Sequence, residues 1–165
     1  KDVLDHPDVG VSNRYERLKW SVRNGNRVKD SLLALDVLTV VPVNKADGQV
    51  KLLTLTPHGK ELVQRILPHR HISRALEGAQ HRYWKNKIAS ALSTAGLHVE
   101  VEKPLNGDRV DVHAENGGTT AIEVETGKSN IPHNIHKDLA AGYDRVIIVP
   151  TNTKAKRKVE KALGR

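Results

Sequence analysis

The spacing of apolar residues predicts helices in the first part of the chain. From Val11 onward apolar side chains recur every three or four positions, and Ser12 is placed to cap a first helix. We expect a turn at Asn24 and Gly25, followed by a second helix. The residues of this second helix that are expected to face inward are Val28, Leu32 and Leu35.

A β-hairpin and a third helix follow. The runs VLTVVPV and QVKLLTLT are rich in β-branched and apolar residues, and Asp47-Gly48 between them is typical of a hairpin turn. Thr56 followed by Pro57 is typical of a helix cap and a first helical residue, because proline is pre-organised for that position. The pattern through residue 67 is therefore helix, helix, hairpin, helix.

The second half alternates strands with helices. HRYWKNKIASALSTAG has the apolar spacing of a helix and ends at a glycine, and the segments LHVEVEK, RVDVHA and TTAIEVE alternate as strands do. IPHNIHKDLAAG is typical of a helix, and DRVIIVP lacks polar alternation, which predicts a strand buried on both faces. The last segment, KAKRKVEKALGR, is predicted to be a basic helix. These elements predict a small α/β sandwich.

Breaks in the apolar pattern predict three regions. Residues 1–67 form one domain, residues 68–80 a linker that includes Pro68, and residues 81–165 a second domain. His69 and His71 lie in the linker without acidic neighbours, so we expect them to be surface residues rather than metal ligands.

Charge indicates a polyanionic partner. The chain has 27 Lys and Arg residues against 19 Asp and Glu, a formal net charge of +8, which suits nucleic acid because basic side chains displace counterions from phosphates. It has no cysteine, which excludes disulfides and thiolate metal sites. Without an apolar run of membrane-spanning length or a signal peptide, we expect no membrane partner and a cytoplasmic, nucleoid-associated location. Because the chain opens on Lys1, it is expected to be part of a longer protein.

Three carboxylates are predicted to converge on the central hairpin of the second half. Side chains alternate along a strand, so Val110 and Val112 should share the core face and Asp111 the opposite one. By the same parity Glu123 and Glu125 face away from the core, and a three-residue loop at residues 116–118 would set Asp111 opposite Glu123. Like charges at this spacing are unfavourable without a cation, which predicts a Mg²⁺ or Mn²⁺ site rather than a solvated acidic face.

The segment AIEVETGKSN also ends like a phosphate-binding loop. That motif requires a glycine five positions before Gly127, and Ile122 stands there instead. We therefore expect Gly127-Lys128-Ser129 to form a turn, with Ser129 or Asn130 capping the next helix.

Residues 11–67, including LTPHGKEL after the hairpin, resemble a winged helix-turn-helix domain. The resemblance implies that the second helix enters a DNA major groove and that the hairpin contacts the backbone. The implied DNA contacts are Asn26, Arg27, Lys29 and Lys45. A winged helix used only for protein contacts is the alternative.

Residues 78–150 resemble the PD-(D/E)xK, or restriction-endonuclease-like, nuclease superfamily. GDRVDVHAENGGTTAIEVETGKS supplies Asp111 and Glu123 at the acidic positions of the motif and Glu125 at its lysine position. The resemblance implies a central mixed sheet between helices and Mg²⁺-dependent hydrolysis of DNA phosphodiesters. Asp111 and Glu123 would then hold the cation, and Glu125 would bind it, or would position or deprotonate the attacking water.

Several residues depart from the family pattern. Asp108 is an alternative to Asp111, although the facing argument favours Asp111. Lys128 follows the strand and would contact phosphate, restore the missing positive charge, or remain solvent-exposed. His81 stands where many members carry a helical acid, as a catalytic, a surface or a capping residue, and Glu100 or Glu102 could substitute for that acid.

The leading hypothesis is a metal-dependent DNA endonuclease targeted by a winged helix. The closing helix would follow the duplex backbone through Lys154, Lys156, Arg157, Lys158 and Lys161, or form an ordinary solvated face. Cutting both strands ordinarily requires two active sites, so a homodimer is one expected assembly. The alternatives are an inactive nuclease fold that serves as a DNA-binding scaffold and a docking domain of a larger DNA-processing protein.

Overall fold

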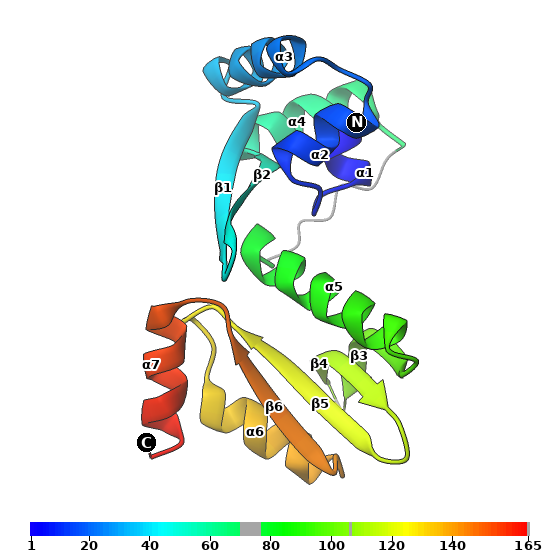
Figure 1. The fold of residues 1–165 in the computed structure, drawn as a ribbon, viewed down its shortest axis with the longest axis vertical. Helices are drawn as coiled ribbons and strands as arrows, with labels where there is room; N and C mark the ends of the chain where they lie inside the picture. Colours follow the sequence, from blue (N-terminus) through cyan, green and yellow to red (C-terminus); the bar gives the residue numbers. More distant parts are fainter. Residues whose placement is uncertain (70–76, 106, 165) are drawn as a thin grey trace. The chain divides into compact units, whose positions relative to one another are not determined.

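The chain has mixed α/β structure and forms two compact units, Lys1–Gln80 and His81–Arg165 (Figure 1). The computed structural model describes residues 1–69, 77–105 and 107–164. Most of the predicted linker, including His71, lies outside the described residues. A helix begins at Ala79, so the end of the segment expected to be a linker is helical.

The first unit consists of helices around a two-stranded sheet. Its elements, in chain order, are α1 (Asp2–Asp5), α2 (Val11–Arg17), α3 (Val22–Ala34), β1 (Leu38–Lys45), β2 (Gly48–Leu55) and α4 (Pro57–Ile66). Strands β1 and β2 pair from Leu38 with Leu55 to Lys45 with Gly48, which confirms the predicted hairpin. The buried cluster of Val37, Leu38 and Leu53 packs against apolar side chains of α1, α2 and α3.

Helix α3 begins earlier than the sequence indicated. Ser21 caps it by accepting a hydrogen bond from the N–H of Asn24 at 3.3 Å, so Asn24 and Gly25 are helical and the predicted turn there is wrong. A Cβ at Gly25 would lie 2.6 Å from the ring of Tyr15, and the glycine therefore permits close packing of α2 on α3. Gly10, rather than Ser12, caps α2, and the side chain of Leu35 is 65% exposed rather than inward.

Helix α4 begins as predicted. The hydroxyl of Thr56 accepts a hydrogen bond from the N–H of Gly59 at 2.9 Å, and Pro57 occupies the first turn. A Cβ on Gly59 would collide with the carbonyl oxygen of Val37. The glycine therefore lets the first turn of α4 lie directly against the chain that enters β1.

The second unit contains a four-stranded sheet in the order β3-β4-β5-β6. Its elements are α5 (Ala79–Thr94), β3 (His98–Leu105), β4 (Asp108–Glu115), β5 (Thr119–Glu125), α6 (Ile131–Ala140), β6 (Arg145–Pro150) and α7 (Thr153–Ala162). The first three strands are antiparallel and β6 is parallel to β5, so the sheet is mixed.

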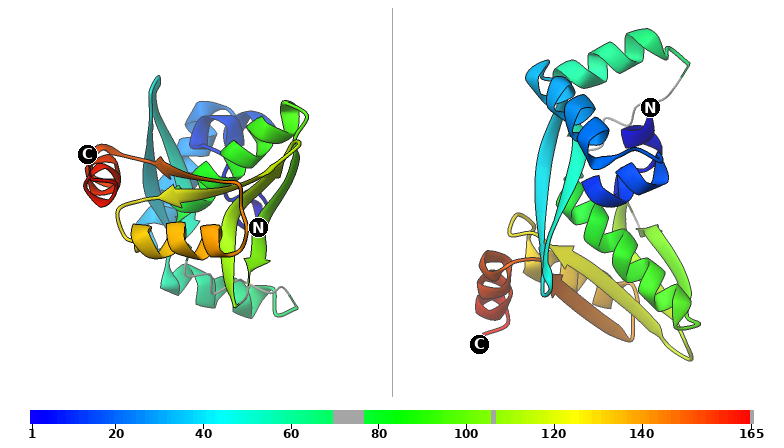
Figure 2. Two further views of the ribbon diagram at one scale, coloured as in Figure 1. Left: turned by 90° about the horizontal axis from the view of Figure 1, so that it is seen from below. Right: turned by 45° about the horizontal axis from the view of Figure 1, so that its top comes forward.

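Helices α5 and α6 lie on opposite faces of this sheet (Figure 2). Ala89 of α5 packs against Val112, Ala114 and Ile122. Ala121 points the other way and packs with Tyr143 and with Ala141 at the end of α6. Within the described ranges, no helix combines the length and apolar character that a membrane span requires.

Strand β6 lies at an edge of the sheet rather than within it. It pairs only with β5 in the described sheet, and Ile147 is 46% exposed. The prediction that this strand is buried on both faces is therefore wrong. An apolar run alone does not reveal the position of a strand in the sheet order.

Candidate functional site

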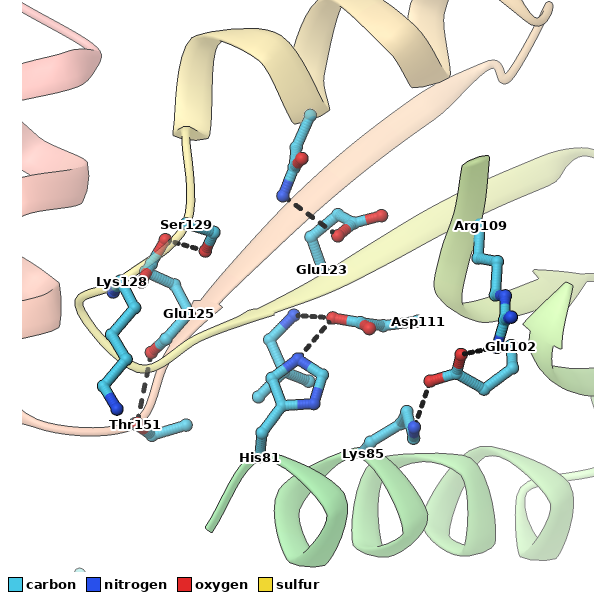
Figure 3. Close-up of polar contacts among 12 residues, drawn as sticks. His81, Lys85, Glu102, Arg109, Asp111, Glu123, Glu125, Lys128, Ser129 and Thr151 are labelled. Atoms are coloured by element: carbon cyan, nitrogen blue, oxygen red, sulfur yellow. Dashed lines mark hydrogen bonds and ion pairs between the residues drawn. The ribbon is translucent and has the colours of Figure 1, made fainter. Parts of the chain in front are cut away.

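Asp111 and Glu123 lie at the centre of the β4-β5 hairpin, as the sequence predicted. Glu115 pairs with Thr119 across a three-residue loop and Val112 pairs with Ile122, so the same register leads to Asp111 and Glu123. Regular pairing ends at this point. The side chain of Asp111 instead accepts a hydrogen bond from the backbone N–H of Val124 on Oδ2 at 2.8 Å (Figure 3).

The predicted facing of Val110 and Val112 is wrong. Val112 packs with the α5 cluster, whereas Val110 packs with Ala121 and Tyr143 on the α6 side. The pairing of β3 with β4 passes over Glu102 and Asp111, and Glu102 has a left-handed backbone with φ 57°. This irregularity interrupts the alternation on which the prediction depended.

Two side chains of α5 reach the acidic residues of this irregular segment. His81 Nε2 lies 2.9 Å from Asp111 Oδ2. One turn later, the buried ammonium of Lys85 donates to Glu102, which also pairs with Arg109 at 3.2 Å. The helix therefore fixes both acids, and Figure 3 shows His81 and Lys85 pointing toward the sheet from the same helix face. His81 thus contacts Asp111 rather than only capping the helix.

Glu123 is buried under α6, with 6% of its surface exposed. Asn134 donates to its Oε2 at 3.2 Å, and Lys137 donates to its Oε1 at 3.1 Å. Burial, followed by the negative charge of Asp111, raises the pKa of Glu123 to about 8. Asp111 therefore acts on Glu123, and the charge of Asp138 acts in the same direction. Asp108 is exposed and lies 3.4 Å from His133, and the N–H of Arg109 lowers its pKa.

Lys137 and Asp138 belong to this centre although the sequence analysis missed them. Lys137 also donates to the carbonyl of Arg109 and lies 3.4 Å from Asp138 Oδ1. Its pKa is raised, because the charge of Glu123 and their hydrogen bond outweigh the lowering effect of burial. Asp138 is fully buried, which raises its pKa. The signal was the spacing of Asn134, Lys137 and Asp138, which puts them on one face of the predicted helix.

Glu125 holds the loop that follows β5. It is 2% exposed, and its Oε1 accepts hydrogen bonds from the backbone N–H groups of Gly127 and of Lys128, the latter at 2.9 Å. Its Oε2 accepts from the hydroxyl of Ser129. Figure 3 shows the carboxylate turned toward this loop and away from Asp111. The side chain of Lys128 is exposed.

The three predicted metal ligands are thus split between two surroundings. Asp111 and Glu123 interact electrostatically, whereas both carboxylate oxygens of Glu125 accept hydrogen bonds from the loop that follows β5. Across the three described ranges, no group of three or more His, Asp or Glu side chains is placed to share one metal ion. Asn130 caps α6 by accepting from His133 N–H at 3.3 Å, which settles the alternative between Ser129 and Asn130.

The candidate DNA contacts of the first unit differ in their surroundings. Arg27 is exposed on α3. The side chain of Asn26 accepts a hydrogen bond from the hydroxyl of Tyr15 at 3.1 Å. Lys29 is paired with Asp30 at 3.1 Å, and Lys45 with Asp47 at 3.1 Å in the hairpin. Arg27 therefore presents the most accessible charge among these candidates.

The closing helix α7 presents most, but not all, of its predicted basic face. Lys158 turns inward and donates to the carbonyl oxygens of Gly127 at 3.4 Å and Ser129 at 2.5 Å. Lys158 therefore stabilises the same loop as Glu125, by binding its carbonyl oxygens. The basic side chains of α7 that remain exposed are Lys154, Lys156, Arg157 and Lys161.

Comparison with models of known protein families, with curated proteins and with solved structures finds no match to this chain.

Proposed function

We propose that the chain is a metal-dependent deoxyribonuclease, with a winged helix that binds DNA and a restriction-endonuclease-like domain that hydrolyses it. The observation that carries the proposal is that the buried Glu123 lies close enough to Asp111 for the negative charge of Asp111 to raise its pKa. The sequence resemblance to the PD-(D/E)xK superfamily places the same two residues at the acidic positions of its motif.

The donor set of this pair fits a hard divalent cation. Mg²⁺ takes oxygen ligands and is commonly bound through one or two carboxylates with water completing its shell. Asp111 and Glu123 would supply these carboxylates once the cation displaces Asn134 or Lys137 from Glu123. Both contacts of Asp111 with His81 and Val124 use Oδ2, which leaves Oδ1 for a ligand. A bound Mg²⁺ would polarise the scissile phosphate and lower the pKa of a coordinated water.

The surrounding side chains have separate roles in this proposal. Lys137, beside Glu123, provides the positive charge that the motif places at the position of Glu125. His81 is oriented by Asp111, and histidine readily exchanges a proton near neutral pH, so we assign it the transfer of a proton from the attacking water. Glu125 holds the loop between β5 and α6, and Lys128 and the exposed side of α7 bind phosphates.

A specific observation favours a second candidate function. Both oxygens of Glu125 are bound within its own loop, so the residue at the lysine position of the motif is not presented to a water molecule. A chain with this arrangement could bind DNA through the same surfaces without cutting it. The alternative is thus an inactive nuclease fold that serves as a DNA-binding scaffold, within a larger DNA-processing protein.

Nuclease assays separate the two functions. We would incubate the protein with plasmid, single-stranded and branched DNA in Mg²⁺, Mn²⁺ or chelator, and measure binding to the same DNAs. Cleavage that requires metal and is lost in Asp111→Asn and Glu123→Gln, but not in the exposed control Glu61→Gln, is the expected result. Binding without cleavage of any substrate would establish the scaffold function. Cleavage by a variant that carries both Asp111→Asn and Glu123→Gln would exclude this site.

A further inference from the structure

Two histidines and two glutamates lie opposite one another on the neighbouring strands β3 and β4, and together they form a square. In the register of β3 with β4, His98 pairs with Glu115 and Glu100 pairs with His113. Opposite residues of antiparallel strands share a face, as do residues two apart along one strand. All four side chains therefore lie on one face of the sheet. It is the face opposite to α5, because the intervening Val99, Val112 and Ala114 pack against that helix.

His113 is the buried corner of this square. It is 2% exposed, and its Nδ1 lies 3.0 Å from the hydroxyl of Tyr143. The rings of His113 and Tyr143 also pack edge to face. Its Nε2 is buried and has no hydrogen-bond partner among the residues that the structure describes. The carboxylate of Glu115 lies close to this nitrogen, with Oε2 at 3.8 Å from Nε2. Leaving a buried polar atom unpaired is unfavourable, so a ligand that binds this nitrogen would remove that penalty.

We propose that His98, Glu100, His113 and Glu115 bind a divalent transition-metal ion of the Zn²⁺ type. Imidazole nitrogen and carboxylate oxygen are ordinary Zn²⁺ ligands, each about 2.0–2.2 Å from the ion. Two such ligands in a tetrahedral shell are then separated by roughly 3.3–3.6 Å, a distance that follows from those bond lengths. The separation of 3.8 Å between His113 Nε2 and Glu115 Oε2 is close to that value.

The other two ligands are free to complete the shell. His98 and Glu100 are exposed, and the weak ion pair of Glu100 with Lys103, at 3.8 Å, is broken at little cost. Their present side-chain rotamers do not converge, in keeping with the absence of a three-residue metal group among the described residues. Rotation about exposed side-chain bonds would bring them to the ion, while the backbone register already puts them at the same place.

Tyr143 orients the buried ligand. Histidines that bind metals commonly use their second ring nitrogen in a hydrogen bond that fixes the ring, and the hydroxyl of Tyr143 occupies that position on His113. The ring is therefore held with Nε2 directed at Glu115 before any ion binds. This site is chemically distinct from the Asp111–Glu123 pair, which offers only oxygen ligands and suits Mg²⁺.

Titration of the full chain, prepared without a polyhistidine tag, with Zn²⁺ tests the site. Isothermal calorimetry should give one ion per chain, and the ¹⁵N resonance of His113 Nε2 should shift on binding. The double variant His98→Ala and Glu115→Gln should bind at least about tenfold more weakly. The control His58→Ala, which removes an exposed histidine of α4, should bind as tightly as the unsubstituted chain.

The outcomes separate this site from the nuclease centre. Glu123→Gln should retain Zn²⁺ binding, and Mg²⁺ should leave the His113 resonance in place. Zn²⁺ binding that is absent, or that the double variant keeps at full strength, would overturn the proposal. So would a titration in which His58→Ala weakens binding as much as the double variant does, because the ion would then bind exposed histidines at random.

Discussion

At the scale of single residues, Glu123 decides the chemistry of the candidate centre. Asn134 and Lys137 donate hydrogen bonds to its carboxylate, which favours the ionised form. Burial and the charge of Asp111 favour the protonated form instead. Burial and the neighbouring charge of Asp111 prevail in the chain alone and raise its pKa to about 8. A residue of this kind responds strongly to pH and to any added positive charge.

Substitution of Glu123 by glutamine should change how stability depends on pH. The pKa of this group rises from 4.5 to about 8 on folding, so between these values the folded chain keeps a proton that the unfolded chain has released. Raising the pH from about 5 to 8 should therefore lower the free energy of unfolding, by up to about 1.4 kcal/mol per pH unit. Glu123→Gln cannot ionise and should lack this loss. Urea unfolding at several pH values measures the difference.

The matched control is Glu61→Gln, which removes an exposed carboxylate from α4. It should follow the pH dependence of the unsubstituted chain. Parallel curves for Glu123→Gln and the unsubstituted chain would show that Glu123 is ionised in the folded protein throughout this range.

At the scale of elements, local signals in the sequence predicted the structural features that depend on residues close together in the chain. The Thr56–Pro57 helix start, both hairpins and the register that leads Asp111 toward Glu123 follow from caps, turn residues and loop length. The prediction failed where the local signal was ambiguous. Asn24 and Gly25 were compatible with a turn, but Ser21 caps a helix that includes both, and Gly25 permits close packing of this helix against Tyr15.

Non-local contacts account for the remaining differences. Strict alternation placed Val110 beside Val112, but the ladder is interrupted where α5 contacts Glu102 and Asp111, and no sequence period reports such a break. Lys137 was not among the predicted site residues. Its role in the site appears only when α6 is packed on the sheet and its ammonium meets Glu123.

The packing of α4 against the start of β1 gives a prediction at the same scale. In an open helix, replacing glycine by alanine is stabilising, because it restricts the unfolded chain. At Gly59 the new Cβ would meet the carbonyl oxygen of Val37, a backbone atom that cannot rotate away. We expect Gly59→Ala to lower the free energy of unfolding by about 1–3 kcal/mol. Gly78→Ala, which meets no atom within 4 Å, should be close to neutral.

At the scale of the whole molecule, the chain has a formal net charge of +8, but some of its basic side chains bind groups inside the protein instead of facing solvent. Lys85, Lys137 and Lys158 all direct their ammonium groups at carboxylates or carbonyl oxygens within the second unit. The positive charge that is available to a polyanion is therefore smaller than the formal count. Exposed side chains such as Arg27, Lys128 and Arg157 contribute most of it.

The salt dependence of DNA binding should reveal which of these charges bind phosphates. For duplex DNA, removing one basic side chain from a phosphate reduces the slope of log K against log salt by about 0.9. We expect Arg27→Ala with Lys29→Ala to weaken binding and to reduce the slope by about 1–2. Arg65→Ala, an exposed control on α4, should leave the slope unchanged. An unchanged slope in the double variant would mean that α3 does not bind the DNA backbone.

The loop between β5 and α6 contains its own anion. Backbone N–H groups of Gly127 and Lys128 and the hydroxyl of Ser129 form a receptor for a negatively charged group, and Glu125 fills it from two residues away. A tethered ligand of this kind acts at an effective concentration in the millimolar range or above, so free phosphate at lower concentrations competes poorly. The conformation of the loop is consequently set by a carboxylate of the chain itself.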